Sequence, residues 1–234
     1  MDGRISVDGV SLAYTLVGIG PPVVLLHGWC CNRGFWREQI PALARSHKVL
    51  DLDFRGHGES DVPDDGYTLE RLAEDVYTVL LGLGVLPAAV VGHSMGGMVA
   101  QRLALDHPDA VFTLALVTTA AADPNDTLLS QRILEDTPAL GYTESFARHS
   151  PGWFSSDGGP GLKGWVTTRM ACVPERVALA LVRDYQDLDY RQELPKVRVP
   201  TLVIGAAADV STPAARSKEI AALIPDSEIL VIEG

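Results

Sequence analysis

The chain has 234 residues, of which 47% are hydrophobic and 21% charged, a composition typical of one large α/β domain with a substantial core. Its formal net charge is −11 and it carries no basic run, so we expect no nucleic-acid partner. No apolar run approaches the ~20 residues that span a bilayer, and the segment from Met1 to Arg4 lacks the apolar core of a signal peptide. We therefore expect no membrane association.

Three cysteines, Cys30, Cys31 and Cys172, form neither a disulfide framework nor a zinc-binding spacing. The odd count, with two of the three adjacent, predicts a protein of the reducing cytoplasm that binds no metal. Nothing in the sequence indicates an oligomeric state.

The first part of the chain predicts a β-hairpin and then a buried strand. Residues 4–7 and 11–17 alternate around Asp8-Gly9, which is a hairpin turn signal. The continuous apolar run over 23–26 is typical of a strand buried on both faces of a parallel sheet, and it ends in His27-Gly28-Trp29.

Helices and strands are then expected to alternate up to residue 118. Apolar residues at i, i+4 and i+7 predict a helix over 36–43, and a second amphipathic pattern predicts one over 69–83 with Thr68 as its N-cap. Strands are predicted at 48–54, 88–91 and 111–118, and a helix from Ser94 to about 107. This alternation indicates crossover connections and a mostly parallel, doubly wound sheet.

The pattern changes over 120–194, where no buried strand is evident. Two helical patterns, over 162–171 and 177–185, predict a helical cap inserted after the sixth strand, because 75 residues are too many for an ordinary loop. A strand over 200–205, a helix beginning at Thr212-Pro213 and a last strand over 227–232 then resume the sheet. We predict that residues 1–119 and 195–234 form the core and 120–194 the cap.

The segment Gly92-His93-Ser94-Met95-Gly96-Gly97 organises the chain, because it joins a predicted strand to a predicted helix. Gly-x-Ser-x-Gly at such a junction is the pattern of a nucleophile elbow, in which a strained backbone exposes the serine side chain. Any Cβ two positions before or after the serine would collide with the tight turn. The N–H groups at the start of the helix favour negative charge beside Ser94.

Together with His27-Gly28-Trp29 and the glycine-rich turn at 53–60, these motifs resemble the α/β-hydrolase superfamily, in particular its capped esterase, perhydrolase and enol-lactonase branch. The resemblance implies that Ser94 is the nucleophile and that the backbone N–H groups of Trp29 and Met95 form the oxyanion hole. It also implies that Asp209, just past a buried strand, is the triad acid. A capping role for Asp209 is the alternative, although Thr212 is better placed for that cap.

The base of this family is a histidine in the loop after the last strand, and the chain as given ends before that loop. We expect this histidine beyond residue 234, little or no turnover by the chain as given, activity in a form extended past Gly234, and exposed apolar surface on the last strand. A deliberate truncation and a natural loss of catalysis are the alternatives. Among the six histidines, His149 in the predicted cap is the one substitute base that its position does not exclude.

The resulting hypothesis is a serine hydrolase without a cofactor that acts on a small-molecule ester, lactone or thioester through an acyl-serine intermediate. A serine at the elbow argues against haloalkane dehalogenases and epoxide hydrolases, which use a carboxylate there. Carbon–carbon bond hydrolysis and cofactor-free perhydrolysis use the same residues and stay open. A hypothesis of a different class is a non-catalytic ligand-binding member of the fold.

Five aromatic residues could form an apolar acyl pocket, or could equally be ordinary packing: Trp29, Phe35, Trp153, Phe154 and Trp165. The adjacent Cys30 and Cys31 follow the predicted oxyanion loop, where small buried residues are the commoner case.

Overall fold

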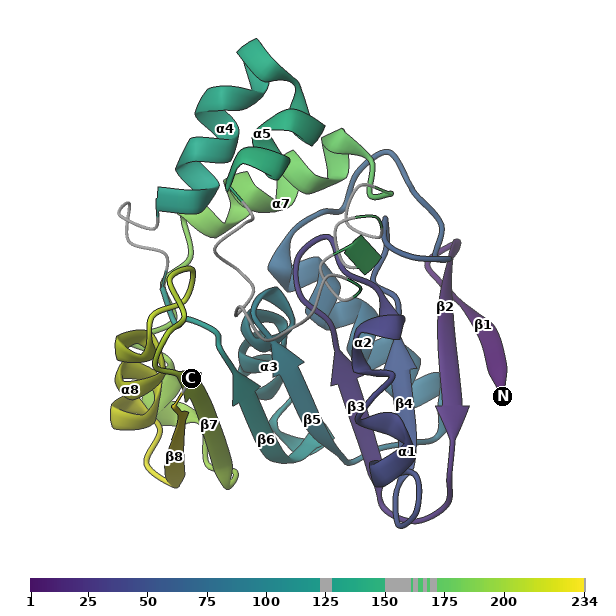
Figure 1. Cartoon of the computed structure of the whole chain (residues 1–234). Helices are drawn as coiled ribbons and strands as arrows, with labels where there is room; N and C mark the ends of the chain where they lie inside the picture. The colour runs from purple at the N-terminus through teal and green to yellow at the C-terminus, as the bar shows by residue number, and fades with distance from the viewer. Residues whose placement is uncertain (123–127, 150–160, 162–163, 166–167, 169–171, 234) are drawn as a thin grey trace.

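In the computed structural model, which describes residues 1–122, 128–149, 161, 164–165, 168 and 172–233, eight strands form one sheet in the order β1-β2-β4-β3-β5-β6-β7-β8 (Figure 1). The pairs β1–β2 and β2–β4 are antiparallel, and every other neighbouring pair is parallel. The predicted mostly parallel, doubly wound sheet is confirmed. The strands are β1 (Asp2–Val7), β2 (Val10–Val17), β3 (Pro22–Leu26), β4 (Lys48–Leu52), β5 (Ala88–His93), β6 (Val111–Val117), β7 (Thr201–Ala206) and β8 (Ser227–Ile232).

The predicted N-terminal hairpin is confirmed, and its turn explains the register. Asp8 and Gly9 have φ values of 49° and 82°. Positive φ at both central residues is the requirement of the tight turn whose twist matches that of paired strands. Val7 therefore pairs with Val10 and Ile5 with Leu12.

Strand residues alternate between two apolar clusters, one on each face of the sheet. Val24 and Leu26 of β3 face the larger cluster, which includes α2 (Leu69–Leu83), α3 (Met95–Asp106) and, through Ile220, α8 (Ala214–Leu223). Val23 and Leu25 face a smaller cluster with η1 (Arg33–Trp36) and α1 (Ile40–Leu43). Two further short 3₁₀ segments are η2 (Pro108–Ala110) and η5 (Leu194–Lys196).

The prediction that Thr68 is the N-cap of α2 is confirmed, because Thr68 Oγ1 accepts a hydrogen bond from Arg71 N at 3.2 Å. Two other predictions for helix starts are wrong. The helix predicted over 36–43 is two short elements, since Asn32 caps a 3₁₀ turn that ends at Trp36 and a separate helix begins at Ile40 with Pro41 in its first turn. The helix predicted from Thr212 begins at Ala214, with Pro213 at its N-cap and no side-chain cap.

Three helices in the described part of the chain between β6 and β7 lie beyond the carboxyl ends of β3 and β5 (Figure 1). They are α4 (Leu128–Leu140), α5 (Tyr142–His149) and α7 (Glu175–Gln186). The helical pattern over 177–185 is confirmed by α7, most of 162–171 lies outside the described residues, and α4 and α5 were not predicted. The division into a core and a cap of residues 120–194 stays a prediction.

The last strand carries exposed apolar side chains, as expected: Leu230 and Ile232 are 51% and 54% exposed. Among the described helices, none combines the length and the apolar character that crossing a bilayer requires.

One buried carboxyl group sets a pH dependence of stability. Asp51 in β4 is 2% exposed, and its Oδ1 has no hydrogen-bond partner among the described residues. Burial, reinforced by the nearby Asp53, raises the pKa of Asp51 to about 9. The folded protein therefore favours the protonated Asp51, whose contribution to stability is complete below the unfolded pKa of about 4 and is lost as the pH rises toward 9.

We expect Asp51→Asn to remove this pH dependence. The free energy of unfolding of the variant should rise relative to that of the parent between pH 5 and pH 8, by at most about 1.4 kcal/mol per pH unit. Thermal unfolding midpoints over that range measure the difference. Asp226→Asn, the same change at an exposed position, is the control. A difference between Asp51→Asn and the parent that does not vary with pH would contradict the assignment.

Candidate active site

Ser94 occupies a strained corner between β5 and α3. Its φ and ψ are 51° and −118°, and it is the N-cap of α3 without making a side-chain cap hydrogen bond. A positive φ is costly for a residue with a side chain, and it persists where the surroundings impose it. The predicted strained conformation is therefore confirmed, and the Ser94 side chain stays half-buried at the carboxyl end of β5.

Two glycines explain how this corner can close. A Cβ on Gly92 would lie 2.3 Å from the carbonyl oxygen of Gly96, and a Cβ on Gly96 would lie 2.3 Å from that of Leu26. Both contacts are with backbone, which cannot move aside. The expected collision on either side of the serine is thus identified atom by atom, and the second one shows that α3 packs directly against the end of β3.

The backbone of Ser94 is held from both sides. Its N–H donates to the carbonyl of Val117 at 3.0 Å, while its own carbonyl accepts from Gly97 N at 2.9 Å and from Thr119 Oγ1 at 2.7 Å. Thr119 was missed by sequence reasoning. Its position two residues past β6, the neighbour of β5, is the signal that could have identified it. Within the described residues, no hydrogen bond engages the Ser94 hydroxyl.

Met95 is the first residue of α3, so its N–H is one of those that lack an intrahelical acceptor. No acceptor in the described part of the chain takes this hydrogen bond. The Met95 side chain is fully buried, which fixes the peptide beside Ser94.

The other wall of the site is a tight turn from Gly28 to Cys31, closed by a hydrogen bond from Cys31 N to Gly28 O at 3.1 Å. Cys30, its third residue, has a φ of 55°, as a type II turn requires. A Cβ on Gly28 would lie 3.4 Å from Ser94 Cβ and 2.8 Å from His93 Nδ1. Glycine at position 28 therefore lets this turn approach the serine.

His27 orients the peptide that joins Gly28 to Trp29. Its Nδ1 lies 2.8 Å from the carbonyl oxygen of Gly28, and its Nε2 accepts from Phe54 N at 3.3 Å. These partners define a neutral imidazole with the proton on Nδ1. Burial lowers the pKa of His27 to about 4, so this form persists near neutral pH. Because the peptide is trans, the Trp29 N–H points to the side opposite His27.

Asp53 ties this loop to the glycine-rich turn. Its carboxylate accepts from Arg33 N at 2.6 Å and from Glu59 N at 2.9 Å, and it pairs with the Arg33 guanidinium. His57 is a buried packing residue with Nδ1 3.0 Å from Arg55 O. Burial lowers the pKa of His57 to about 3.

The predicted aromatic residues lie in different environments. Phe35 stacks on His93, the residue that precedes Ser94, and the two ring centroids lie 4.6 Å apart. The buried Trp29 ring donates from Nε1 to Ala178 O of α7 at 3.1 Å. Trp165 is half-buried, with the Arg37 guanidinium 3.9 Å from its ring centroid. Trp153 and Phe154 lie outside the described residues.

Asp209 is half-buried just after β7, and its Oδ1 accepts from the N–H groups of Ser211 and Thr212, both at 2.8 Å. Those N–H groups precede α8, so Asp209 closes a turn and does not cap the helix. Thr212 does not cap the helix either. No imidazole among the described residues contacts the Asp209 carboxylate.

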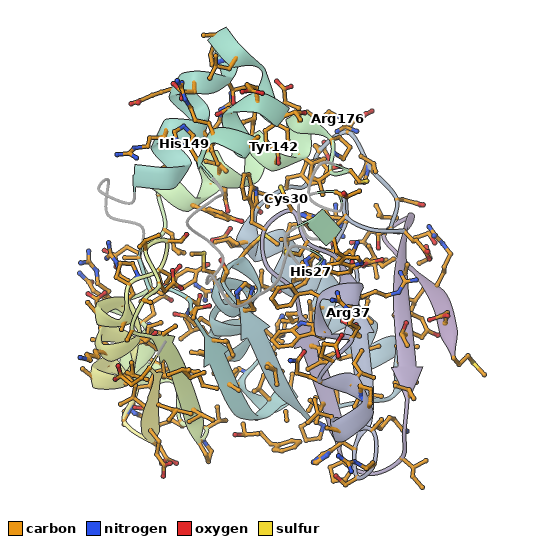
Figure 2. All side chains as sticks on the ribbon, viewed as in Figure 1. His27, Cys30, Arg37, Tyr142, His149 and Arg176 are labelled. Carbon is orange, nitrogen blue, oxygen red and sulfur yellow. The ribbon has the colours of Figure 1, made fainter. Side chains whose placement is uncertain are left out.

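His149 is engaged elsewhere. Its Nε2 lies 2.9 Å from Asp136 Oδ2, and Figure 2 shows it among the helices α4 and α5. This pairing gives His149 a partner within those helices and no described contact with Ser94. The described residues also contain no group of three or more histidine, cysteine or acidic side chains arranged to hold a metal ion.

Comparison with known proteins agrees with this geometry. The family model described as alpha/beta hydrolase fold matches residues 21–156. The AB hydrolase superfamily protein YisY of Bacillus subtilis is 28% identical, over 95% of this chain and 87% of that protein. A hydrolase from Pseudomonas aeruginosa PA01 is 32% identical with a TM-score of 0.89, over 99% of this chain and 89% of that one.

The enol-lactonase from Burkholderia xenovorans LB400 is 27% identical with a TM-score of 0.91, over 98% of this chain and 91% of that one. The family match covers more than half of the chain, and the solved structures share its whole described fold. The chain therefore belongs to the α/β-hydrolase family and is a hydrolase.

Proposed function

We propose that this hydrolase cleaves a small ester, lactone or thioester through an acyl-Ser94 intermediate, without a cofactor. The observation that carries the proposal is the positive φ of Ser94 at the end of β5, opposite the turn at Gly28. A hydroxyl held in such a corner, between a helix N-terminus and a second backbone turn, is the arrangement that acyl transfer uses.

In the proposed reaction, Ser94 Oγ attacks the carbonyl carbon, and the N–H groups of Trp29 and Met95 stabilise the oxyanion. The base takes the Ser94 proton and returns it to the leaving oxygen or sulfur. Collapse of the tetrahedral intermediate then expels the alcohol or thiol, which in a lactone stays tethered to the acyl group, and leaves acyl-Ser94 for water to hydrolyse to the acid and free Ser94. Each oxyanion donor contributes roughly 3–4 kcal/mol to transition-state stabilisation in reactions of this kind.

Asp209 fits the role of the acid that orients the base. Two backbone N–H groups hold its Oδ1, so the carboxylate has a fixed direction, while its Oδ2 makes no hydrogen bond among the described residues. The base is an imidazole that the described residues do not bring to Ser94. The sequence-based expectation that this histidine follows residue 234 stays a prediction.

Two observations support a small acyl substrate. The Phe35 ring stacks on His93, the residue that precedes Ser94, and the buried Trp29 ring belongs to the turn opposite the serine. The structurally similar Burkholderia protein is named as an enol-lactonase, whose substrate class falls within the proposed one. Location in the cytoplasm, and a small molecule as the sole partner, stay predictions.

We expect a fluorophosphonate probe to label a form extended past Gly234 at Ser94 and to leave the Ser94→Ala variant of that form unlabelled. For residues 1–234, hydrolysis of p-nitrophenyl butyrate should rise with added imidazole, because the free imidazole accepts the serine proton. Ser94→Ala should show at least roughly 10³-fold less of this imidazole-dependent activity. Mass spectrometry of the labelled peptide and initial-rate kinetics measure the two effects.

Imidazole hydrolyses activated esters by itself, and Ser94→Ala supplies that background. Equal rates in the parent and in Ser94→Ala, together with no labelling of either a 1–234 or a longer form, would refute the enzyme hypothesis. The ligand-binding hypothesis would then replace it.

A second expectation concerns the approach of the turn to the serine. Gly28→Ala places a methyl group 2.8 Å from His93 Nδ1, so either the turn or the His93 ring beside Ser94 must shift. In the extended form, we expect probe labelling to slow at least roughly tenfold, since a displacement of about 1 Å in a reacting constellation can cost 10²-fold. Gly161→Ala is the matched control, because its Cβ would meet no described atom within 4 Å. Equal labelling rates in the two variants would show that the turn does not contribute to the reaction.

A further inference from the structure

The turn at Gly28–Cys31 is supported from outside the sheet by two helices that come much later in the chain. The Trp29 indole donates to Ala178 O of α7 at 3.1 Å, and Cys30 Sγ lies 3.0 Å from the hydroxyl of Tyr142, the first residue of α5. The Trp29 and Tyr142 rings meet edge to face, with centroids 6.3 Å apart. Figure 2 shows Tyr142 directed from α5 toward Cys30.

Helix α7 is firmly attached to the sheet domain. Arg176 donates to the carbonyls of Val62, Pro63 and Asp64, and the Asp184 carboxylate accepts from Leu69 N at the start of α2. Trp29 adds the link to Ala178. Three separate points along α7 therefore fix this helix over the site.

The helix pair α4–α5 is attached differently. Its other described side-chain hydrogen bonds stay within the pair: Thr137 and Ser145 donate to Ile133 O, and His149 pairs with Asp136. Among the described side-chain hydrogen bonds, the one between Tyr142 and Cys30 joins α5 to the loops around Ser94.

Cys30 is the residue of the turn that most needs support. Its φ of 55° is unfavourable for a side chain, and glycine is the usual residue at this turn position. The side chain is fully buried, and its thiol meets the buried Tyr142 hydroxyl. By holding the Cys30 thiol, Tyr142 maintains the turn in which the Gly28 carbonyl faces Cys31 N and His27. The Trp29 N–H of the same peptide then points in the opposite direction.

We propose that Tyr142 is a positioning residue for the oxyanion turn: by binding the Cys30 thiol it holds Trp29 N–H in its donating orientation when α5 is docked. The inference rests on the proposed function, because it assigns Trp29 N–H to the oxyanion. Oxyanion stabilisation then depends on the helix pair that covers the site, and a substrate that displaces α5 weakens its own hydrolysis.

The test is Tyr142→Phe, with Tyr190→Phe as the matched control. Both tyrosines are buried, but the Tyr190 hydroxyl has no hydrogen-bond partner among the described residues. With imidazole added as the base, we expect Tyr142→Phe to lower kcat for p-nitrophenyl butyrate roughly tenfold, which is less than the 10²–10³-fold cost of removing an oxyanion donor outright. KM should stay within about twofold, because the turn acts in the transition state. Tyr190→Phe should change neither constant.

A double-mutant cycle separates this role from general packing. Glycine adopts a positive φ freely, so Cys30→Gly keeps the turn without needing the thiol. In the Cys30→Gly background, Tyr142→Phe should no longer lower kcat. An equal loss of kcat in both backgrounds, or equal kcat values for Tyr142→Phe and Tyr190→Phe, would overturn the proposal.

Hydrogen exchange of the peptide spanning residues 26–34 provides a readout that needs no turnover. Exchange should be faster in Tyr142→Phe than in the parent and in Tyr190→Phe, and unchanged exchange would overturn the proposal. Probe labelling of a form extended past Gly234 is read separately. No labelling of that form at Ser94, together with the exchange difference, would refute the hydrolytic function and with it the catalytic consequence of the Tyr142 contact.

Discussion

Contact between two backbones, with no side chain between them, is the constraint on which this site depends. Ser94 holds a positive φ, a conformation that costs about 1–3 kcal/mol for a non-glycine residue, because the chain before and after it packs against Leu26 and Gly97 with no room for a Cβ at positions 92 or 96. The sheet stabilises this strain by burying β3 and β5 on both faces. The geometry of the proposed site is thus fixed by the same close packing that holds the sheet together.

The second wall of the site depends on a different interaction. The turn from Gly28 to Cys31 has few internal hydrogen bonds, and it is held instead by His27 from below and by Trp29 and Cys30 contacts with the later helices. A backbone donor can be aimed only as well as its peptide plane is held. The orientation of Trp29 N–H therefore depends on two kinds of contact. One is local, between His27 and the Gly28 carbonyl at the end of β3, and the others are made with α5 and α7.

This difference explains what could be predicted from the sequence. The hairpin at Asp8-Gly9, the N-cap at Thr68 and the close approach of Gly92 to Gly96 at the Ser94 corner depend on neighbours within a few residues, so residue type and spacing were sufficient. The helices α4 and α5 were missed because few described side chains in them are buried and Pro138 lies inside α4. Contacts such as Tyr142 with Cys30, 112 residues apart, follow no local pattern.

The buried histidines complete the electrostatic argument. Burial lowers the pKa of His27 and His93 to about 4 and that of His57 to about 3, so near neutral pH all three are uncharged. As neutral groups they orient peptides and pack against Phe35 and Phe54 without placing a fixed charge beside Ser94. The developing oxyanion would then be stabilised by backbone dipoles and by the imidazolium formed on the base. These three histidines therefore support the loops of the site, and in the proposed function the proton acceptor is a fourth group, an imidazole oriented by Asp209.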